Sequence, residues 1–278
     1  MKVGLCLGGG GARGLSHIVV FEILDELGVK VAAISGSSIG ALLGMGYAGG
    51  MSGREIRSYT LSKFSDSTQV LAQLWSLRPA NIRDWFNPQS YSIGQIDPEK
   101  ILSFYTPVDD LPERIEDLEI PLRVIATDYY AWRDIEFASG PLKPAVAASI
   151  AIPLVFKPMR VNGKVIIDGN ITNPLPVDRL KKDGLDRVIA VDVVGGPLDD
   201  GTTEIPTGIE SILGANQIMM QELTRQKLNE FGEPDVLIRP PINRFGVLDF
   251  LKASTIVRVT DAIRDDIKRE IAEALEAA

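Results

Sequence analysis

Residues 1–40 read MKVGLCLGGGGARGLSHIVVFEILDELGVKVAAISGSSIG, and this stretch decides the fold. A short apolar run ends in four consecutive glycines, and then Val19, Ile23 and Leu27 recur at helical spacing. A second apolar run at 31–34 leads into small residues that are typical of a tight turn followed by a helix. Strand, loop, helix, strand, turn and helix in this order predict a parallel sheet with helices packed against it.

The turn after the second strand matches the pattern of a nucleophile elbow, Gly36-Ser37-Ser38-Ile39-Gly40. In such an elbow a strand turns so sharply into a helix that only glycines fit two residues before and after the serine. The serine is held in a strained backbone conformation, and the positive end of the helix favours a developing alkoxide. Ser38 is therefore the candidate nucleophile, and a glycine-rich turn that merely packs tightly is the alternative.

The glycine run after the first strand admits two interpretations. From Gly9 to Gly14 it matches G-x-G-x-x-G, a pattern of dinucleotide-binding sites, but such a site also needs an acidic residue at the end of the second strand. That strand ends here in Ser35-Gly36 without a carboxylate, which argues against a nucleotide site. Consecutive glycines also leave backbone N–H groups free to converge on an oxyanion. Arg13, within the run, either fixes this loop or attracts an anionic head group.

The base that would activate Ser38 is not a histidine of the usual kind. The chain has one histidine, His17, and none follows Ser38, where serine hydrolases commonly carry their base. A local packing or hydrogen-bonding role is the alternative for His17. Asp168 is the most suggestive acid, because an apolar run ends in Asp168-Gly169 and active sites of parallel sheets open at strand ends. An Asp-Gly turn in a β-hairpin is the alternative.

Length and composition limit the remaining choices. The 278 residues suffice for one large α/β domain, and no repeat, low-complexity tract or linker divides them, so we expect a single domain over 1–278. The net charge of −8 argues against nucleic-acid binding and against purely electrostatic docking on anionic lipid. The single cysteine, Cys6, predicts no disulfide and no zinc site, and it fits a reducing cytoplasm. The first residues resemble a strand more than a signal peptide.

Other elements follow from periodicity and capping. The spacing of Ser52 and Glu55 predicts a helix from 53 to about 63, and further helices are expected at 209–229 and 256–275. Strands are expected at 122–127, 135–137 (as a hairpin partner), 188–193 and 236–238. The apolar and aromatic residues between Phe64 and Tyr91 form either a lid or acyl groove, or part of an ordinary core. If exposed, they would bring a negatively charged protein to lipid through apolar contact.

In this order, four motifs resemble the patatin-like phospholipase family, particularly its compact prokaryotic members. The first two are the glycine loop Gly9–Gly14 with His17 just after it, and the elbow Gly36–Gly40. The other two are Ala126-Thr127-Asp128 with Ala148–Pro153, and Asp168-Gly169 followed by Asn173-Pro174. The resemblance covers most of the chain. One departure is Asn170, since the family commonly has glycine or alanine after Asp-Gly, and it bears on the local turn more than on catalysis.

The resemblance implies an α/β fold, a three-layer α/β/α sandwich with a mostly parallel central sheet. It also implies a Ser–Asp dyad in which Asp168 accepts the proton of Ser38, which explains the missing histidine. The oxyanion hole would be formed by N–H groups of Gly9, Gly10 and Gly11, the last two foremost. The residues in supporting roles would be Arg13, Gly14, Gly36, Gly40 and Gly169. Since a carboxylate is a weak base near neutral pH, we expect a partly desolvated Asp168 with a raised pKa.

The function expected from these residues is that of a cytoplasmic serine acyl hydrolase of the phospholipase A, lysophospholipase or carboxylesterase type. Its partner would be a lipid or another acyl ester, with transient contact to a membrane surface. The prediction includes no cofactor and no metal. Two alternatives stay open, an acyltransferase using the same acyl-enzyme and a non-catalytic lipid-binding regulator. The intact Ser38, Asp168 and glycine loop argue against the regulator, and the sequence leaves the oligomeric state undetermined.

Overall fold

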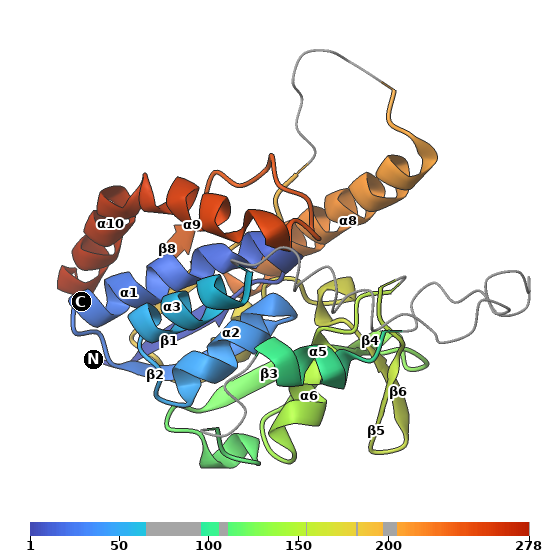
Figure 1. Ribbon diagram of the computed structural model, residues 1–278. Helices are drawn as coiled ribbons and strands as arrows, with labels where there is room; N and C mark the ends of the chain where they lie inside the picture. The colour runs from blue at the N-terminus through green and yellow to red at the C-terminus, as the bar shows by residue number, and fades with distance from the viewer. Residues whose placement is uncertain (65–95, 106–110, 154, 182, 197–204, 278) are drawn as a thin grey trace, which may run out of the picture.

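The computed structural model describes residues 1–64, 96–105, 111–153, 155–181, 183–196 and 205–277 (Figure 1). Its central feature is an eight-stranded sheet in the order β5-β6-β3-β2-β1-β7-β8, with β4 paired to β3. The strands are β1 (Val3–Leu7), β2 (Val31–Ser37), β3 (Leu122–Asp128), β4 (Arg133–Phe137), β5 (Met159–Val161), β6 (Lys164–Ile167), β7 (Arg187–Val191) and β8 (Val236–Ile238).

The sheet has a parallel part and an antiparallel part. Strands β3, β2, β1, β7 and β8 run parallel, and they are rich in apolar residues because both of their faces are covered. Strands β4 and β6 both run antiparallel to β3, and β5 runs antiparallel to β6. The hairpin β5–β6 turns at Asn162 and Gly163, both with positive φ, as a two-residue hairpin requires.

Helices cover the sheet on both faces, which gives three layers (Figure 1). Within β1, Leu5 and Leu7 join the main apolar core, while Cys6 points to the opposite face and meets Val177. The first face carries α1, α2, α3, α6, α9 and α10, and the second carries α7 with α8 over it. The helices are α1 (His17–Glu26), α2 (Ile39–Ala48), α3 (Gly53–Phe64), α5 (Pro98–Tyr105), α6 (Leu142–Ser149), α7 (Val177–Leu180), α8 (Gly208–Phe231), α9 (Ala253–Asp261) and α10 (Arg264–Glu276).

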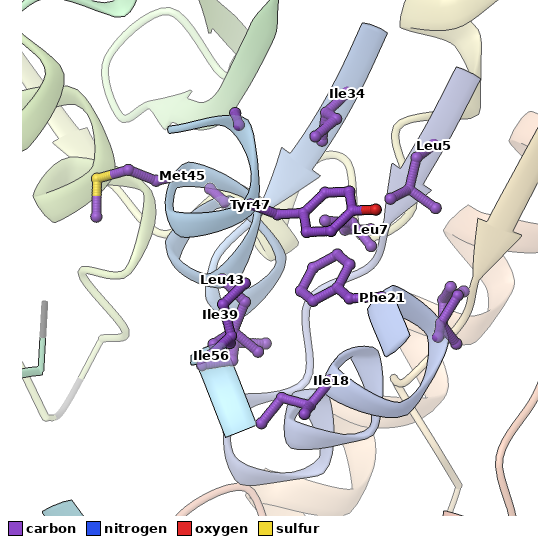
Figure 2. Packing of buried hydrophobic residues seen from close by; sticks show 14 of the residues in the cluster. Leu5, Leu7, Ile18, Phe21, Ile34, Ile39, Leu43, Met45, Tyr47 and Ile56 are labelled. Carbon is purple, nitrogen blue, oxygen red and sulfur yellow. The ribbon is translucent and has the colours of Figure 1, made fainter. Parts of the chain in front are cut away.

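The strand-to-helix turn at the start of α2 packs against the main apolar core, part of which is shown in Figure 2. Phe21 of α1 stacks on Tyr47 of α2 with ring centroids 4.5 Å apart and an interplanar angle of 8°. The Tyr47 hydroxyl donates to Asp25 at 2.8 Å, so its polar end is satisfied. Ile34 and Ile39, on either side of the strand-to-helix turn, are both buried in this cluster, which anchors the turn.

Most elements expected from the sequence are present, and the expected α/β fold with a mostly parallel central sheet is confirmed. Strands β1, β2, β3, β4, β7 and β8 lie where they were predicted, and β4 is the hairpin partner of β3. The capping box is formed, since Ser52 N–H donates to Glu55 at 2.8 Å. Beyond Phe64, the predicted lid or groove region lies outside the described residues.

The helix indicated by the spacing of Val19, Ile23 and Leu27 is α1, which starts at His17 after a 3-10 turn at Gly11–Ser16. One helix prediction was wrong. The helix expected at 256–275 is two helices, α9 and α10, separated at Ala262 and Ile263. Buried Thr260 of α9 donates to Ser16 Oγ at 2.9 Å, and α10 packs against β7, β8 and α1. The apolar spacing continues across this break without a glycine or a proline, so periodicity alone does not reveal it.

The main core cluster contains residues from Val3 to Ile271. None of the helices among the described residues combines the length and apolarity needed to cross a lipid bilayer.

Candidate active site

Ser38 sits on a strained turn between β2 and α2. Its φ and ψ are 52° and −123°, a conformation that non-glycine residues rarely adopt. A Cβ on Gly40 would lie 2.2 Å from the carbonyl oxygen of Leu7, so no other residue fits there. This is the geometry of a nucleophile elbow, with the serine at the N-terminus of a ten-residue helix.

Strand register brings Asp168 level with Ser38. Ser37 pairs with Ile125 between β2 and β3, and Ile167 pairs with Thr127 between β6 and β3. The residues that follow, Ser38 and Asp168, therefore both reach the level of Ala126. They do so on the same edge of β3, because β4 occupies the other edge from Val124 to Asp128. Strands β2 and β6 thus approach one edge of β3 from opposite ends, which brings the two side chains together.

The two side chains are hydrogen-bonded. Ser38 Oγ donates to Asp168 Oδ2 at 2.6 Å, and both residues are 2% exposed. The second carboxylate oxygen accepts from the N–H of Asn170 at 2.8 Å. The alternative of an Asp-Gly hairpin turn is wrong, because Asp168 caps a short 3-10 turn and the hairpin of β6 lies at its other end.

The reason given for Asp168 from the sequence was wrong in part. We expected its strand to end where parallel strands end, but β6 runs antiparallel to β3. Its carboxyl end reaches Ser38 because β6 pairs only with the last residues of β3, which extend past the elbow. The geometry is therefore set by register across three strands.

Burial sets the protonation of Asp168. Desolvation raises the pKa of its carboxyl to about 7, while the hydrogen bonds from Ser38 and Asn170 act in the opposite direction. A carboxyl with this pKa is a far better proton acceptor near neutral pH than an exposed aspartate. The raised pKa agrees with the desolvation expected from the sequence.

The segment 148–153 forms hydrogen bonds with both Ser38 and Asp168, although the sequence indicated no role for its side chains. Ser149 Oγ accepts from the N–H of Ser38 at 2.8 Å and donates to the Ile125 carbonyl at 2.6 Å. The carbonyl of Ala151 accepts from the N–H of Asp168 at 3.1 Å. A buried serine in an apolar, alanine-rich run is the signal that could have identified Ser149.

A second hydrogen bond that the sequence did not indicate joins β3 to Asp168. Thr127 Oγ1 donates to the Asp168 carbonyl at 2.8 Å and lies 2.8 Å from Thr172 Oγ1. Thr127 belongs to the expected motif at 126–128, but its side-chain bond depends on β6 lying beside β3.

The glycine loop lies over the elbow, and its N–H groups differ in their partners. Gly8 and Gly9 donate to the carbonyls of Val191 and Pro174 at 2.9 Å and 3.0 Å. Among the described residues, Gly10 and Gly11 have no acceptor for their N–H groups. Gly9, expected as an oxyanion donor, therefore has its N–H occupied, and the free donors are Gly10 and Gly11.

The remaining supporting glycines fill places where side chains would collide. Gly14 lies against Ile39, Gly36 against the backbone of Ala41, and Gly169 against the Ile125 carbonyl. They allow the glycine loop and the Asp168 turn to pack closely against the elbow and β3.

Arg13 is fully buried beneath the glycine loop. Its Nε donates to the Gly10 carbonyl at 3.4 Å, and the side-chain amide of Gln217 in α8, with its oxygen inward, accepts from Nη2 at 2.9 Å. Burial lowers the pKa of the guanidinium to about 10, so it remains charged near neutral pH. With no solvent exposure, Arg13 fixes the loop, and the alternative of attracting a head group is wrong.

His17 is also buried, and it is bonded to the loop. One ring nitrogen, Nε2, lies 2.8 Å from the Gly8 carbonyl, and burial lowers the pKa of the imidazole to about 4. A neutral ring donating from Nε2 satisfies this geometry. No hydrogen bond among the described residues joins His17 to Ser38.

Asn170, the departure from the family pattern, fits without distorting the turn. Its backbone N–H donates to the capping carboxylate of Asp168, and its φ is not in the positive region. The carboxamide packs on Gly9, where a Cβ would lie 1.7 Å from Asn170 Oδ1. The turn geometry is therefore retained.

An apolar pocket adjoins the elbow. Ile39, directly after Ser38, and Leu15, directly after the glycine loop, line one part of it. The rest is lined mainly by α2 and α3, with Phe64 and Phe250 stacked at a centroid distance of 5.5 Å. Across the described parts of the chain, no group of three or more His, Cys, Asp or Glu side chains is arranged to hold a metal ion.

The chain is similar in sequence to proteins of one known family. The sequence model of the patatin-like phospholipase family matches residues 5–181. An uncharacterised NTE family protein of Mycobacterium tuberculosis is 36% identical over 207 residues, which cover 73% of this chain and 53% of that protein. The lysophospholipase NTE1 of Coccidioides immitis is 30% identical over 286 residues, or 93% of this chain and 17% of that protein.

Among solved structures, VipD from Legionella pneumophila is similar over 94% of this chain and 66% of its own, with a TM-score of 0.43 and 16% identity. ExoU from Pseudomonas aeruginosa, in complex with SpcU, is similar over 99% of this chain and 52% of its own, with a TM-score of 0.46 and 12% identity. This chain spans about half the length of the mycobacterial relative, and much less of the fungal one.

Proposed function

The chain belongs to the patatin-like phospholipase family, and on that premise we propose that it hydrolyses carboxylic esters of lipids through an acyl-enzyme on a Ser38–Asp168 dyad. The observation that carries this proposal is the 2.6 Å hydrogen bond from Ser38 Oγ to a buried carboxylate with a raised pKa. A serine on a strained elbow and a carboxylate poised near neutral pH form a nucleophile and its base.

In the first half of the reaction, Ser38 Oγ attacks the acyl carbonyl as its proton passes to Asp168 Oδ2. The carbonyl oxygen becomes an oxyanion, and the free N–H groups of Gly10 and Gly11 stabilise it. When the C–O bond to the leaving alcohol breaks, Asp168 returns the proton to that oxygen. The acyl group is then bonded to Ser38.

In the second half, water attacks the acyl-enzyme and gives its proton to Asp168. The oxyanion again lies at Gly10 and Gly11, and its collapse releases a carboxylic acid as Asp168 reprotonates Ser38 Oγ. The carboxylate therefore accepts and returns a proton twice per cycle, for which a pKa near the working pH is best suited.

The substrate class follows from the family and from the apolar pocket beside Ile39. A pocket lined by leucine, isoleucine and phenylalanine suits the acyl chain of a lipid ester. The relative from Coccidioides immitis is named a lysophospholipase, which agrees with a lipid ester substrate. We infer a cytoplasmic location only from the single, buried and free Cys6.

Hydrolysis of a chromogenic ester series from short to long acyl chains tests the proposal, with Ser38→Ala beside the wild type. We expect turnover that falls by about 10⁴-fold or more in Ser38→Ala, as for the loss of a catalytic serine in other hydrolases. Product analysis for free acid or transferred ester separates hydrolysis from acyl transfer. Wild-type protein that cleaves no ester, or a folded Ser38→Ala that retains turnover, would overturn the proposal.

A further inference from the structure

The exposed apolar side chains are unevenly distributed over the molecule. Of the large hydrophobic side chains that are exposed in the described ranges, all but Met1 and Phe231 belong to three segments. These segments are the β3–β4 turn with Tyr129, Tyr130 and Trp132, the start of α8 with Ile212, Leu213, Ile218 and Met219 together with Ile205 just before it, and the stretch with Leu248 and Leu251. Apolar exposure gathered in this way marks an interaction surface.

All three segments leave the edge of the sheet at which the dyad lies. The β3–β4 turn continues from the carboxyl end of β3, four residues past the level of the elbow. Because β7 and β8 are parallel, the helix between them, α8, begins at the carboxyl edge of the sheet (Figure 1). The stretch with Leu248 follows the carboxyl end of β8.

Contacts tie each segment to the site. Thr127, two residues before Tyr129, donates to the Asp168 carbonyl at 2.8 Å. Gln217, directly before Ile218, faces the guanidinium of Arg13 under the glycine loop. The carbonyl of Val247, directly before Leu248, accepts from Ala12 of the same loop at 2.8 Å. Each segment therefore adjoins a support of the catalytic groups, and together the three segments form what we term the apolar rim.

The β3–β4 turn displays its aromatic side chains rigidly. Trp132 is 89% exposed and has a φ of 55°, a conformation that is costly for a bulky side chain and that asparagine or glycine would adopt more easily. The turn is fixed by the N–H of Trp132, which donates to the Asp128 carbonyl at 3.0 Å, and by Lys164, which pairs with the Asp128 carboxylate at 3.0 Å. Among the described residues, no contact offsets the strain or the exposure of the indole.

The start of α8 has the composition of an interfacial helix. Residues 211–220 contain no charged side chain. Ile212 and Met219 are seven residues apart and so lie on one face, which is exposed, while Gln217 turns toward Arg13. The tetrapeptide Tyr129-Tyr130-Ala131-Trp132 is also uncharged.

We propose that the apolar rim docks on the surface of a lipid bilayer, with the β3–β4 turn and the start of α8 entering the interface on either side of the dyad. Tyrosine and tryptophan favour the membrane–water interface, because one part of each ring system is apolar and one part is polar. With a net charge of −8, the chain binds through apolar contact and not through attraction to anionic lipid. The choice of lipid as the partner rests on the proposed function, but docking itself requires no catalysis.

Flotation with vesicles of zwitterionic phosphatidylcholine tests the docking, in the Ser38→Ala background so that the lipid stays intact. We compare the pair Tyr130→Ser and Trp132→Asn, the pair Ile218→Ser and Met219→Ser, and the control Phe231→Ser. Asparagine tolerates the positive φ at position 132, and Phe231 lies at the opposite end of α8, away from the rim. The turn pair and the α8 pair should each weaken partitioning by about tenfold or more, and the control by less than about twofold.

Salt and a local probe sharpen the result. Partitioning of the Ser38→Ala protein should change by less than about twofold between 0.05 and 0.5 M salt, because apolar contacts are not screened. An environment-sensitive dye on Ala131→Cys should shift to the blue on vesicle binding, and Cys6, the other thiol, is buried. No binding to phosphatidylcholine, binding that vanishes at high salt, or unchanged partitioning in the turn pair would overturn the proposal. Unchanged partitioning in the α8 pair would remove that element from it.

Catalysis provides a second readout in the active enzyme. The turn pair should retain kcat/KM on a monomeric short-chain ester and lose about tenfold on the same ester class in vesicles. If the wild type cleaves neither substrate, the proposed function fails while flotation still tests docking. Variants that abolish self-association in place of vesicle binding would identify the rim as an interface between copies and overturn the proposal.

Discussion

The two catalytic side chains are positioned by different kinds of structure. Ser38 is positioned by one continuous stretch, 31–48, in which a strand turns into a helix against a packed core. Asp168 follows a four-residue strand that pairs with β3 at only two positions, and it depends on Thr127 and Ala151 for its backbone contacts. The difference teaches that the nucleophile is encoded locally, while its base is placed by contacts between segments far apart in the chain.

The largest effect after loss of the catalytic side chains should come from Gly10→Ala. Its Cβ would lie 2.2 Å from the Val193 carbonyl, so the loop must move and carry its free N–H groups away from the oxyanion. We expect kcat to fall by about 10²- to 10³-fold, as for the loss of an oxyanion donor. Gly196→Ala is the matched control, because no atom of the described residues lies within 4 Å of its added Cβ. Equal activity in the two variants would remove Gly10 from the oxyanion hole.

Removing one hydrogen bond that supports Ser38, or one that supports Asp168, tests the comparison directly. Thr127→Val deletes the bond to the Asp168 carbonyl, and Ser149→Ala deletes the bond to the Ser38 N–H. Because the elbow is held by its own strand and helix, we expect Ser149→Ala to lower stability by about 1–3 kcal/mol with a small loss of kcat. Thr127→Val should lower kcat more, by about tenfold. Steady-state kinetics and urea unfolding measure both, and the reverse order of kcat losses would contradict the comparison.

The fold and the nucleophile could be predicted from sequence to a large extent, because their signals are local. The glycines at 36 and 40 and the apolar run before them define the elbow without reference to the rest of the chain. Asp168 does lie next to Ser38 in space, as predicted. The prediction assumed, however, that Asp168 ends a strand of the parallel part of the sheet, and its strand β6 is antiparallel to β3. The occupied N–H of Gly9 and the Gln217 partner of Arg13 come from segments over 160 residues away, and no local pattern indicates them.

Two buried titratable groups should give opposite slopes of stability against pH. The pKa of Asp168 is raised in the folded state, so its stabilising contribution is present below pH 4 and is lost as the pH rises toward 7. Between pH 5.5 and 8, the melting temperature of Asp168→Asn relative to that of the wild type should therefore increase as the pH rises, by about 2 °C or more. A difference in melting temperature between Asp168→Asn and the wild type that does not change with pH would contradict the raised pKa of Asp168.

The pKa of His17 is lowered in the folded state, so its contribution is present above pH 6.5 and is lost as the pH falls toward 4. His17→Gln keeps a donor for the Gly8 carbonyl, so the variant should lose less stability than the wild type as the pH falls from 6.5 to 5.5. Its ester hydrolysis should stay within about threefold of the wild type, the smallest effect of the series. A loss comparable to that of Ser38→Ala would make His17 the base.

The most direct test of the Ser38–Asp168 dyad is the pH dependence of kcat/KM for the wild type, Asp168→Asn and the double variant Ser38→Ala/Asp168→Asn on one monomeric ester. The dyad predicts a wild-type rate that rises about tenfold per pH unit and levels off near pH 7. It also predicts an Asp168→Asn variant that is nearly inactive at every pH, with no further loss in the double variant. An Asp168→Asn enzyme that retains activity within tenfold of the wild type, with the same pH profile, would contradict it.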